Sequence, residues 1–464
     1  MNAIILSAIW GVLMMFSGVF IKSKTTPKYL AIVGIIIVFI ANACELDVFG
    51  LGVMQFSIDT KEMLNVNSFS LSFLAVVFAC TLLYFLLNGR DVEKVGEHVG
   101  EYFALIFFVL CGVSIVATYN TLLLLFLGIE IMSIPLYILT GSDKRNLKSN
   151  EASLKYFLMG AFSTGILLMG IAFIYGGNPN GSFFINNIQL GEGPMPAMIA
   201  VGLVFLVIAL SFKVSAAPFH FWTPDVYEGS PTLITAFMST VVKTAGFAAF
   251  LRLFITCFSP LADFWVPTII VITSLTLFIG NITALYQTSF KRMLAYSSIS
   301  HAGYMLFAII GLGGTAVNAV IVYSTAYTIA SIIAFAVLIL VKKQMGNDSY
   351  KSFDGLAKKN PFLAFSLTVA MLSLAGIPLT AGFMGKFFMF ASAVSQYQLW
   401  LVVIAIINAV IGIFYYFRVI LSMYFKEGNA VLLFTPIQFK MVLAIGVILT
   451  FVFGLYPSLI SDLF

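Results

Sequence analysis

The run VIALSFKVSAAPFHFW, residues 207–222, decides the fold of this chain. It is apolar enough to cross a bilayer, yet it contains Lys213 and then Pro218. An ionisable side chain at the centre of a bilayer costs about 2.5–3.5 kcal/mol on insertion scales. A proline inside a helix frees the carbonyl four residues earlier, which here belongs to Val214. We therefore expect a membrane helix that is interrupted beside a buried charge.

The whole chain has the composition of a membrane protein. It has 464 residues, of which 61% are hydrophobic and only 9% are charged, whereas soluble domains average about 25% charged residues. A spanning helix needs about 20 apolar residues. Such windows predict an all-α integral membrane protein with about fourteen transmembrane helices, near 2–21, 29–47, 66–88, 101–118, 120–140, 153–175, 197–219, 231–256, 266–287, 294–312, 316–341, 362–391, 397–424 and 438–460.

The basic residues alternate between the two sets of loops. We name each loop by the numbers of the predicted helices that it joins. Of the 24 Lys and Arg residues, 18 lie in or beside loops that lead from an odd-numbered helix to an even-numbered one. Only Lys61 lies in a loop of the other set, and the remaining five fall inside predicted helices. Basic loops stay in the cytoplasm, so both termini are expected on the periplasmic side and the helix count is expected to be even. The 223–230 loop departs from the trend, since it carries Asp225 and Glu228 and no basic residue.

Several ionisable residues lie inside the predicted helices: Glu130, Lys213, Lys243, Arg252, His301, Lys386 and Arg418. Three buried lysines on separate helices are hard to explain by packing, because lysine is flexible and changes its protonation readily on burial. A carboxylate such as Glu130 lowers the cost of burying a lysine beside it. Arginines near helix ends can instead snorkel or pair, and a lone histidine can be a hydrogen-bonded core residue. We expect the glutamate, the histidine and the three lysines to transfer protons.

The second interruption is predicted in GIPLTAGFMGKFFMF, residues 376–390. Pro378 frees the carbonyl of Leu374, and Gly382 and Gly385 let backbone and water approach Lys386. Helices seven and twelve are therefore expected to be broken where protein or water satisfies the freed carbonyls. The alternative is that these prolines only kink their helices.

The two broken helices are five helices apart, so the second runs opposite to the first across the membrane. This spacing is typical of transporters that contain two inverted repeats. We expect a three-helix segment at residues 1–100, a first five-helix unit at 101–256, an inverted second unit at 257–428 and a last helix at 429–464.

The sequence lacks the motifs that bind nucleotide cofactors or metals. It has no P-loop and no glycine-rich dinucleotide fingerprint, and its four cysteines and three histidines have no metal-ligand spacing. We therefore expect no cofactor and no metal in this chain, and no nucleic acid as a partner. The cysteines are interpreted as small hydrophobic residues.

Five segments carry a family resemblance: LGIEIMSIPLYIL (127–139), SFKVSAAPFHFWTPDVYEGSPT (211–232), VVKTAGFAAFLR (241–252), KRMLAYSSISHAGYML (291–306) and MLSLAGIPLTAGFMGKF (371–387). Together they resemble the antiporter-like membrane subunits of respiratory complex I and of cation/proton antiporters. The likeness is greatest to the N-type subunits of bacterial NADH:quinone oxidoreductase. The N type is favoured because the chain has no long lateral helix after its fourteen helices and because the charge of helix twelve is a lysine.

The resemblance implies a role for each buried residue. Glu130 and Lys213 match the family's paired residues of helices five and seven, and Lys243 its connecting lysine. His301 lies in the segment that links the halves, and Lys386 matches the lysine of the outlet half. The resemblance further implies that NADH, FMN, iron–sulfur clusters and quinone bind other subunits, that the partners are M-type and K-type membrane subunits, the redox arm and lipid, and that the chain lies in the bacterial inner membrane. A subunit of a stand-alone cation/proton antiporter is the alternative.

Overall fold

The structure is a computed structural model of the chain. It describes all residues except 22, 24, 49, 51, 52, 54, 57, 88–97, 189–194, 312, 313, 395–398, 429, 430 and 462–464. In the described part the regular elements are helices, and β pairing is limited to three isolated bridges. The predicted all-α membrane architecture is therefore confirmed.

Twelve helical spans in the described residues are long and apolar enough to cross a membrane. They are α1 (Asn2–Phe20), α2 (Thr26–Glu45), α3 (Ser68–Leu87), α4 (Val99–Thr118), α5 (Leu122–Thr140), α6 (Leu147–Gly177), the continuous run α9–η3–α10 (Thr232–Thr256), α11 (Ala262–Leu285) with the short η4 before it, α12 (Phe290–Ile310), α13 (Gly314–Met345), α17 (Leu399–Phe425) and α18 (Ile437–Leu455). Three shorter apolar helices are α7 (Ala197–Lys213), α15 (Pro361–Ala375) and α16 (Ala381–Val394). The count of fourteen crossings stays an interpretation, because it needs α15 and α16 to be two halves of one crossing.

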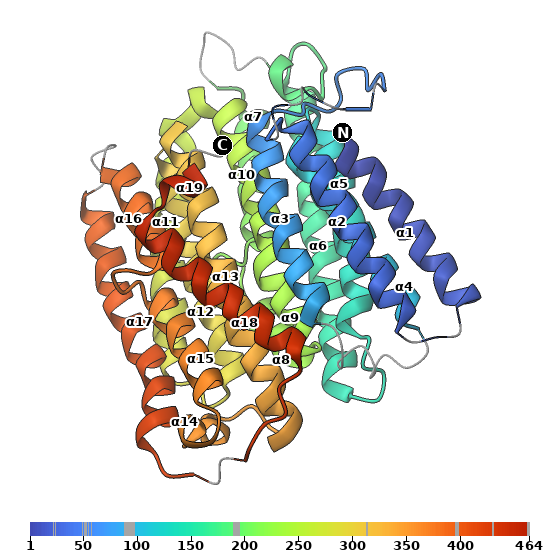
Figure 1. Ribbon diagram of the computed structural model, residues 1–464. Coiled ribbons are helices and arrows are strands. Elements are labelled where there is room, and N and C mark those ends of the chain that lie inside the picture. The colour runs from blue at the N-terminus through green and yellow to red at the C-terminus, as the bar shows by residue number, and fades with distance from the viewer. Residues whose placement is uncertain are drawn as a thin grey trace.

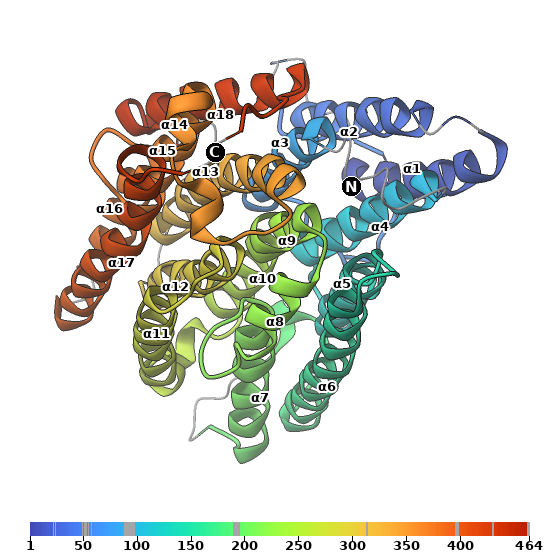
Figure 2. The ribbon, with the colours of Figure 1, turned by 90° about the horizontal axis from the view of Figure 1, so that it is seen from below.

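The helices form a buried central group and an exposed outer ring. The run α9–η3–α10, α12 and α13 have nearly all of their apolar-window residues buried, whereas in α1, α6, α17 and α18 fewer than half of those residues are buried. Figure 2 shows the first group in the middle of the bundle and the second at its edge. Large apolar side chains such as Phe162 and Phe414 are exposed on the ring. This pattern suits a bundle whose outer surface meets hydrocarbon.

The chain begins and ends at the same end of the bundle. Helix α1 starts there, and the short α19 (Ser458–Ser461), which follows the tilted α18, lies at the same end (Figure 1). This arrangement agrees with an even number of crossings.

Both predicted helix breaks are confirmed. We call residues 214–221, between α7 and the short α8 (Trp222–Gly229), the first break, and residues 376–380, between α15 and α16, the second break. The prediction that helix seven runs to residue 219 was wrong: α7 ends at Lys213 because Ser215 adopts a left-handed conformation with φ of 65°. In the second break Gly376 ends α15 in the same way, with φ of 83°. The other predicted helices agree with the structure to within a few residues.

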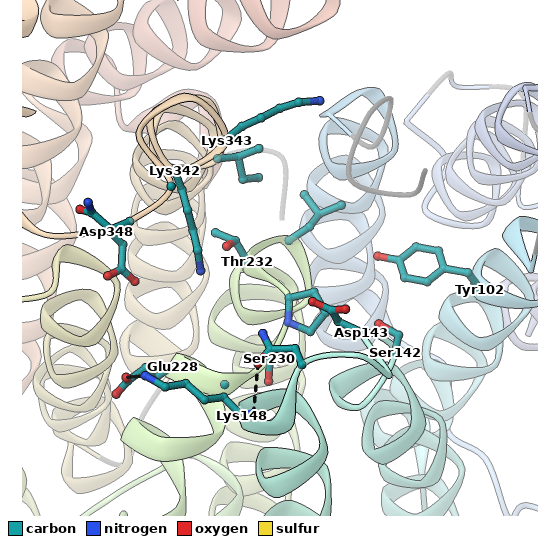
Figure 3. Close-up of a pocket in the computed structure, with 17 residues that line it drawn as sticks. Tyr102, Ser142, Asp143, Lys148, Glu228, Ser230, Thr232, Lys342, Lys343 and Asp348 are labelled. Atoms are coloured by element: carbon teal, nitrogen blue, oxygen red, sulfur yellow. Dashed lines mark hydrogen bonds and ion pairs between the residues drawn. The ribbon is translucent and has the colours of Figure 1, made fainter. Parts of the chain in front are cut away.

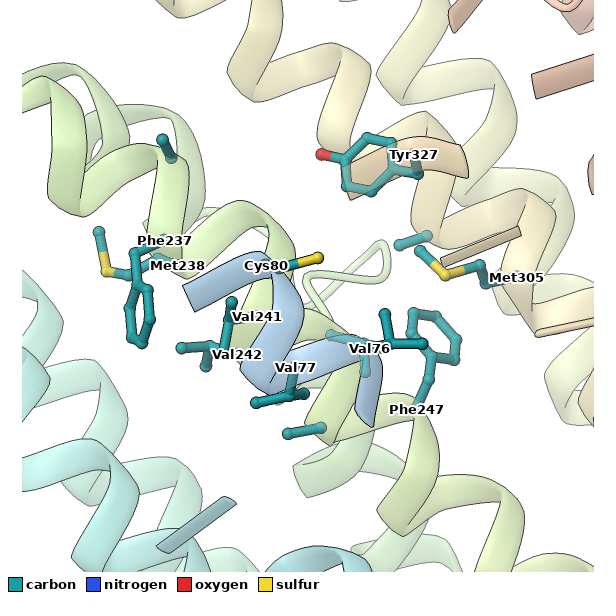
Figure 4. Packing of buried hydrophobic residues seen from close by; sticks show 14 of the residues in the cluster. Val76, Val77, Cys80, Phe237, Met238, Val241, Val242, Phe247, Met305 and Tyr327 are labelled. Atoms are coloured by element: carbon teal, nitrogen blue, oxygen red, sulfur yellow. The ribbon is translucent and has the colours of Figure 1, made fainter. Parts of the chain in front are cut away.

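A π-helical turn, η3 (Met238–Val242), lies between α9 (Thr232–Phe237) and α10 (Lys243–Thr256). No feature of the sequence predicts it. Helix α3 packs against this region through Val77 and Cys80, as Figure 4 shows. Single π turns inside α-helices occur frequently at functional sites, and this one directly precedes Lys243.

Candidate functional site

Lys213 is the last residue of α7, and its side chain reaches α5. Its Nζ donates a hydrogen bond to Ser133 Oγ at 2.9 Å, and Ser133 donates to the Ile129 carbonyl at 2.6 Å. Glu130 is half-buried and lies three residues before Ser133, on the same helix face. The described residues include no ion pair within 4.0 Å between Glu130 and Lys213. Glu130 on α5 and Lys213 on α7 therefore lie on neighbouring helices, as expected. Lys213 contacts the hydroxyl of Ser133 instead of the carboxylate of Glu130.

The open end of α7 is closed by a neutral donor. Trp222, the first residue of α8, donates from Nε1 to the Phe212 carbonyl at 3.1 Å. Its ring is held by stacking on Tyr156, with centroids 4.8 Å apart and planes 13° apart. Lys213 is therefore not needed as the cap of its own helix, and its charge is available to α5.

Lys243 links α10 to α12 in the middle of the bundle. It follows the π turn, is only 2% exposed, and donates to both the carbonyl (2.7 Å) and the hydroxyl (2.6 Å) of Ser298 on α12. No carboxylate lies within 4.0 Å of it among the described residues. A buried cation with no counter-ion is unusual for a structural lysine.

His301 on α12 has a phenol on each ring nitrogen. Nδ1 lies 2.6 Å from the hydroxyl of Tyr323 on α13, and Nε2 lies 3.0 Å from the hydroxyl of Tyr416 on α17. The hydroxyl of Tyr416 also shares a hydrogen bond with Ser297 Oγ at 2.5 Å. The histidine is thus fully hydrogen-bonded, and it joins three helices.

Lys386 on α16 closes the end of α15. Its Nζ donates to the carbonyls of Leu374 (3.1 Å) and Ala375 (2.8 Å), and it lies 4.8 Å from the centre of the Tyr304 ring. The carbonyl that Pro378 was expected to free is therefore bound by Lys386. A cation at a helix C-terminus is stabilised by the helix dipole, and no carboxylate pairs with Lys386 in the described part of the chain.

The buried Arg252 and the half-buried Arg418 serve as helix caps. Arg252 donates from Nη1 to the carbonyl of Ala117, near the end of α4, at 2.8 Å. Arg418 donates to the carbonyl of Leu285, the last residue of α11, at 3.4 Å. The interpretation that they pair structurally near helix ends is the one these contacts favour.

An ion network explains why the 223–230 loop is acidic. Lys148 lies 3.0 Å from Glu228, Lys155 lies 3.0 Å from Asp225, and Arg292 pairs with both acids. Burial alone would raise the pKa of Glu228, but its hydrogen bonds with Arg292 and Lys148 hold that pKa below its ordinary value. Basic residues near the starts of α6 and α12 therefore neutralise this acidic segment, which the structure shows to be mostly the short helix α8.

A polar cavity of about 330 Å³ lies beside this network, where α9 begins. Its charged lining residues are Asp143, Lys148, Glu228, Lys342, Lys343 and Asp348. Figure 3 shows Lys342 pointing toward Thr232 at the start of α9. A cavity of this size and polarity can hold several waters, so protons can exchange here with titratable groups.

Sequence reasoning missed the hydroxyl groups that bind Lys213, Lys243 and His301. Within the described hydrogen bonds the five predicted residues do not touch one another. The hydroxyls belong to Ser133, Ser298, Tyr323 and Tyr416, and Lys386 is bound by backbone carbonyls. A signal was present, because three of these hydroxyls share an apolar helix with a charge or with His301. The described residues contain no group of three or more His, Cys, Asp or Glu side chains that could hold a metal.

Comparisons with known proteins give a consistent result. Residues 119–412 match the family model described as NADH:quinone oxidoreductase/Mrp antiporter, TM. The chain is 41% identical to the NADH-quinone oxidoreductase subunit N of Cytophaga hutchinsonii, over 100% of this chain and 99% of that one. It is 38% identical to the subunit of the same name from Flavobacterium psychrophilum over the full length of both. Among solved structures it resembles a chain of respiratory complex I from Thermus thermophilus, with a TM-score of 0.84, 31% identity and coverage of 100% and 99%.

Proposed function

Because this chain belongs to the family of N subunits of NADH-quinone oxidoreductase, within the wider NADH:quinone oxidoreductase/Mrp antiporter family, we propose that protons cross it along Glu130, Lys213, Lys243, His301 and Lys386. Members of this family are antiporter-like, proton-translocating membrane subunits of respiratory complex I, and so is this chain. NADH oxidation and quinone reduction drive the pumping from elsewhere in the complex.

One observation carries the choice of residues. Lys243 and Lys386 are buried between the helices and Lys213 is half-buried there, and none of the three forms an ion pair within 4.0 Å in the described part of the chain. Each ammonium is held instead by a serine hydroxyl or by backbone carbonyls. Removing a buried lysine's proton leaves no unpaired carboxylate behind, so such a lysine can lose and regain its charge.

The cycle begins at the first break. Lys213 has two acceptors on one face of α5: the Ser133 hydroxyl that it contacts and the Glu130 carboxylate one turn away. A signal from a neighbouring subunit moves Glu130 relative to Lys213. When the carboxylate is near, its field favours the charged lysine, and when it moves away the proton is released.

The released proton passes through water to Lys243 and then to the second unit. Lys243 is bound to Ser298 on α12, the helix that carries His301 one turn later. From His301 the proton reaches Lys386 at the second break, which releases it outward. The order of these steps follows the family resemblance and the chain of contacts.

The cavity at the start of α9 is where we place proton uptake from the cytoplasm. Both termini then face the periplasm, as the basic loops predict, although Lys22, Lys24, Arg90 and Lys94 lie outside the described residues. A cysteine introduced at Asn146, in the cavity wall, should not react with an impermeant thiol reagent in intact cells. Ready labelling from outside would reverse this orientation.

We place the two inverted units at residues 101–256 and 257–428, flanked by segments 1–100 and 429–464. Three features support this division. Each unit contains one broken helix. In the first unit α4 packs on α5 and α6 on α7, and in the second α11 packs on α12 and α13 on α15 and α16. An arginine near the end of the last helix of each unit caps an earlier helix.

Other subunits supply the redox chemistry. The chain works with further membrane subunits and the redox arm of the complex, and we assign its direct neighbours to the M and K types. NADH, FMN, iron–sulfur clusters and quinone are placed in those other subunits. The membrane is the bacterial inner membrane, and lipid contacts the outer ring of helices.

Replacement of Lys213 by alanine tests this function. The assembled enzyme should lose most of its proton uptake into inverted vesicles and most of its coupled NADH oxidation. Exposed Lys144, on the surface of the 141–146 loop, offers a control: Lys144→Ala removes a lysine outside the path and should pump normally. Full pumping by assembled Lys213→Ala enzyme would exclude Lys213 from the path.

A double-mutant cycle tests the partnership of Glu130 with Lys213. If the two act as a unit, Glu130→Gln combined with Lys213→Ala should reduce pumping little more than the worse single change. Strictly additive losses in the logarithm of the rate would mean that the two residues act separately.

A further inference from the structure

Four buried groups form one hydrogen-bonded chain through His301. They are the hydroxyls of Ser297, Tyr416 and Tyr323 and the imidazole itself, each at most 3% exposed. The order is Ser297 Oγ, Tyr416 hydroxyl (2.5 Å), His301 Nε2 (3.0 Å), His301 Nδ1 and Tyr323 hydroxyl (2.6 Å). The chain starts at Ser297 on α12, passes to α17, returns to α12 at His301 and ends on α13.

Every link of this chain can reverse its direction. A neutral imidazole has one donor nitrogen and one acceptor nitrogen, and a phenol or serine hydroxyl can both donate and accept. Neither the Tyr416–Ser297 link nor the two links to His301 has a fixed donor. The same atoms therefore support two hydrogen-bond patterns, which differ in the histidine tautomer.

A charged imidazolium is unfavourable at this place. Burial opposes the charge, because the His301 side chain is only 3% exposed to solvent. No carboxylate lies within 4.0 Å to compensate in the described part of the chain. A route that keeps the ring neutral at its resting points avoids this cost.

We infer that Tyr416 and Tyr323 are catalytic residues that pass protons to and from neutral His301, an inference that rests on the proposed function. A proton arriving at Ser297 displaces that hydroxyl's proton to Tyr416. The Tyr416 O–H bond breaks as the Nε2–H bond forms, and the Nδ1–H bond breaks as a new O–H bond forms on Tyr323. Tyr323 releases its original proton on the far side, so one proton enters and one leaves. Reorientation of the ring and the hydroxyls restores the first tautomer.

Each end of the chain lies beside a residue or helix that holds or carries a lysine of the path. Ser297 precedes Ser298, whose hydroxyl holds Lys243. At the other end the Tyr323 ring packs on Gly385, where an added Cβ would lie 2.9 Å from Tyr323 Cδ2. Gly385 precedes Lys386, so the phenol sits directly beside the element that carries the outlet lysine.

The neighbouring tyrosine provides a matched control. Tyr415 is as buried as Tyr416, at 1% exposure, and lies next to it on α17. Its hydroxyl donates to Asn281 Oδ1 at 2.9 Å and makes no hydrogen bond with His301. Tyr416→Phe and Tyr415→Phe each remove one buried hydroxyl, but only the first removes a hydroxyl that bonds His301.

The test measures proton uptake into inverted vesicles during NADH oxidation, normalised to assembled complex. Loss of a general acid–base group predicts roughly tenfold or greater slowing for Tyr416→Phe, with Tyr415→Phe close to the parent enzyme. Equal pumping by the two variants would overturn the inference. If Lys386→Ala also pumps fully, the proposed path itself fails; if Lys386→Ala does not pump while Tyr416→Phe does, only the chain through His301 fails.

A second readout separates proton transfer from simple anchoring of the ring, and it decides the question if Tyr416→Phe does not assemble. Replacing Tyr416 by 3-fluorotyrosine keeps the hydroxyl and nearly the same shape but makes the phenol more acidic. A proton-transferring phenol should then give a changed pumping rate, while 3-fluorotyrosine at Tyr415 should not. An unchanged rate at Tyr416 would mean that this hydroxyl only positions His301, and the inference would be wrong.

Discussion

The first and second breaks both place an open helix end inside the membrane, but different donors close it. At the first break a neutral indole, that of Trp222, binds the Phe212 carbonyl. At the second break the ammonium of Lys386 binds the carbonyls of Leu374 and Ala375. At the second break the lysine itself caps the helix before it, whereas at the first break Lys213 does not cap α7.

This difference separates two uses of a buried lysine. Lys213 is released from capping and can exchange partners on α5. Lys386 cannot lose its proton without weakening the charge-assisted bonds that hold the end of α15, because hydrogen bonds from charged donors are stronger than those from neutral ones. Protonation and backbone geometry are thus coupled at the second break, and much less so at the first.

The largest effect is expected from a methyl group added at the second break. A Cβ at Gly382 would lie 1.8 Å from the Ser373 carbonyl oxygen, so Gly382→Ala must push α16 away from α15. A Cβ at Gly246 on α10, near the first break, meets only Val214 Cγ1 at 3.0 Å. Native gels should show little assembled complex for Gly382→Ala and nearly normal amounts for Gly246→Ala. Equal assembly would mean that the second break is not closely packed.

The next effect compares methionine at the two lysines. Lys386→Met leaves two buried carbonyls without their donor, and an unsatisfied buried group costs about 1–3 kcal/mol. Lys213→Met removes only a donor to Ser133, which keeps its bond to the Ile129 carbonyl. The temperature at which the purified complex dissociates should therefore fall further for Lys386→Met than for Lys213→Met. Equal falls would show that the two lysines are held alike.

A smaller effect is expected for the neutral cap. Trp222→Phe removes the indole donor to the Phe212 carbonyl, which keeps the backbone N–H of Ser215 at 3.1 Å. An aromatic ring stays beside Tyr156, so we expect a loss of about 1 kcal/mol. Pumping per assembled complex should stay near normal, because Trp222 carries no proton. A large loss of pumping without loss of stability would give the indole a role in transport.

The smallest effect concerns the ion network that tethers α8 after the first break. The second break has no counterpart to it, since in the described residues no ion pair joins α15 or α16. The pKa of Glu228 is held below its ordinary value, so its stabilisation is present at neutral pH and is lost as the pH falls through that lowered pKa. Glu228→Gln should cost no more than about 1 kcal/mol at neutral pH. The difference in dissociation temperature between the Glu228→Gln complex and the parent complex should become smaller at acidic pH. A difference that persists there would not be electrostatic.

Sequence alone predicted the membrane architecture and both breaks, because hydropathy and proline act locally along the chain. It also placed Lys386 beside the freed Leu374 carbonyl. It did not predict the π turn before Lys243, which lies where α9 and α10 pack against α3. Nor did it predict that Ser133 would take the place of Glu130 as the contact of Lys213, since that choice depends on the depth at which α7 ends.

The hydrogen-bond partners of His301 show the same limit. Tyr323 and Tyr416 lie 22 and 115 residues after it in the chain, on different helices. Apolar windows and charge counts carry no information on which helices meet. Only the packing of α12 against α13, and of α17 against α11 and α15, brings the phenols to the imidazole.

The most direct test of the account is proton uptake by Lys386→Arg enzyme. Arginine keeps the donors that close α15 but does not release its proton at working pH. If Lys386 must gain and lose a proton, the Lys386→Arg complex should assemble with normal thermal stability, should pump poorly in inverted vesicles, and should be exceeded in pumping by Lys386→His. Parent-like pumping by an assembled Lys386→Arg complex would contradict the account, because the residue would then act only as a fixed cap.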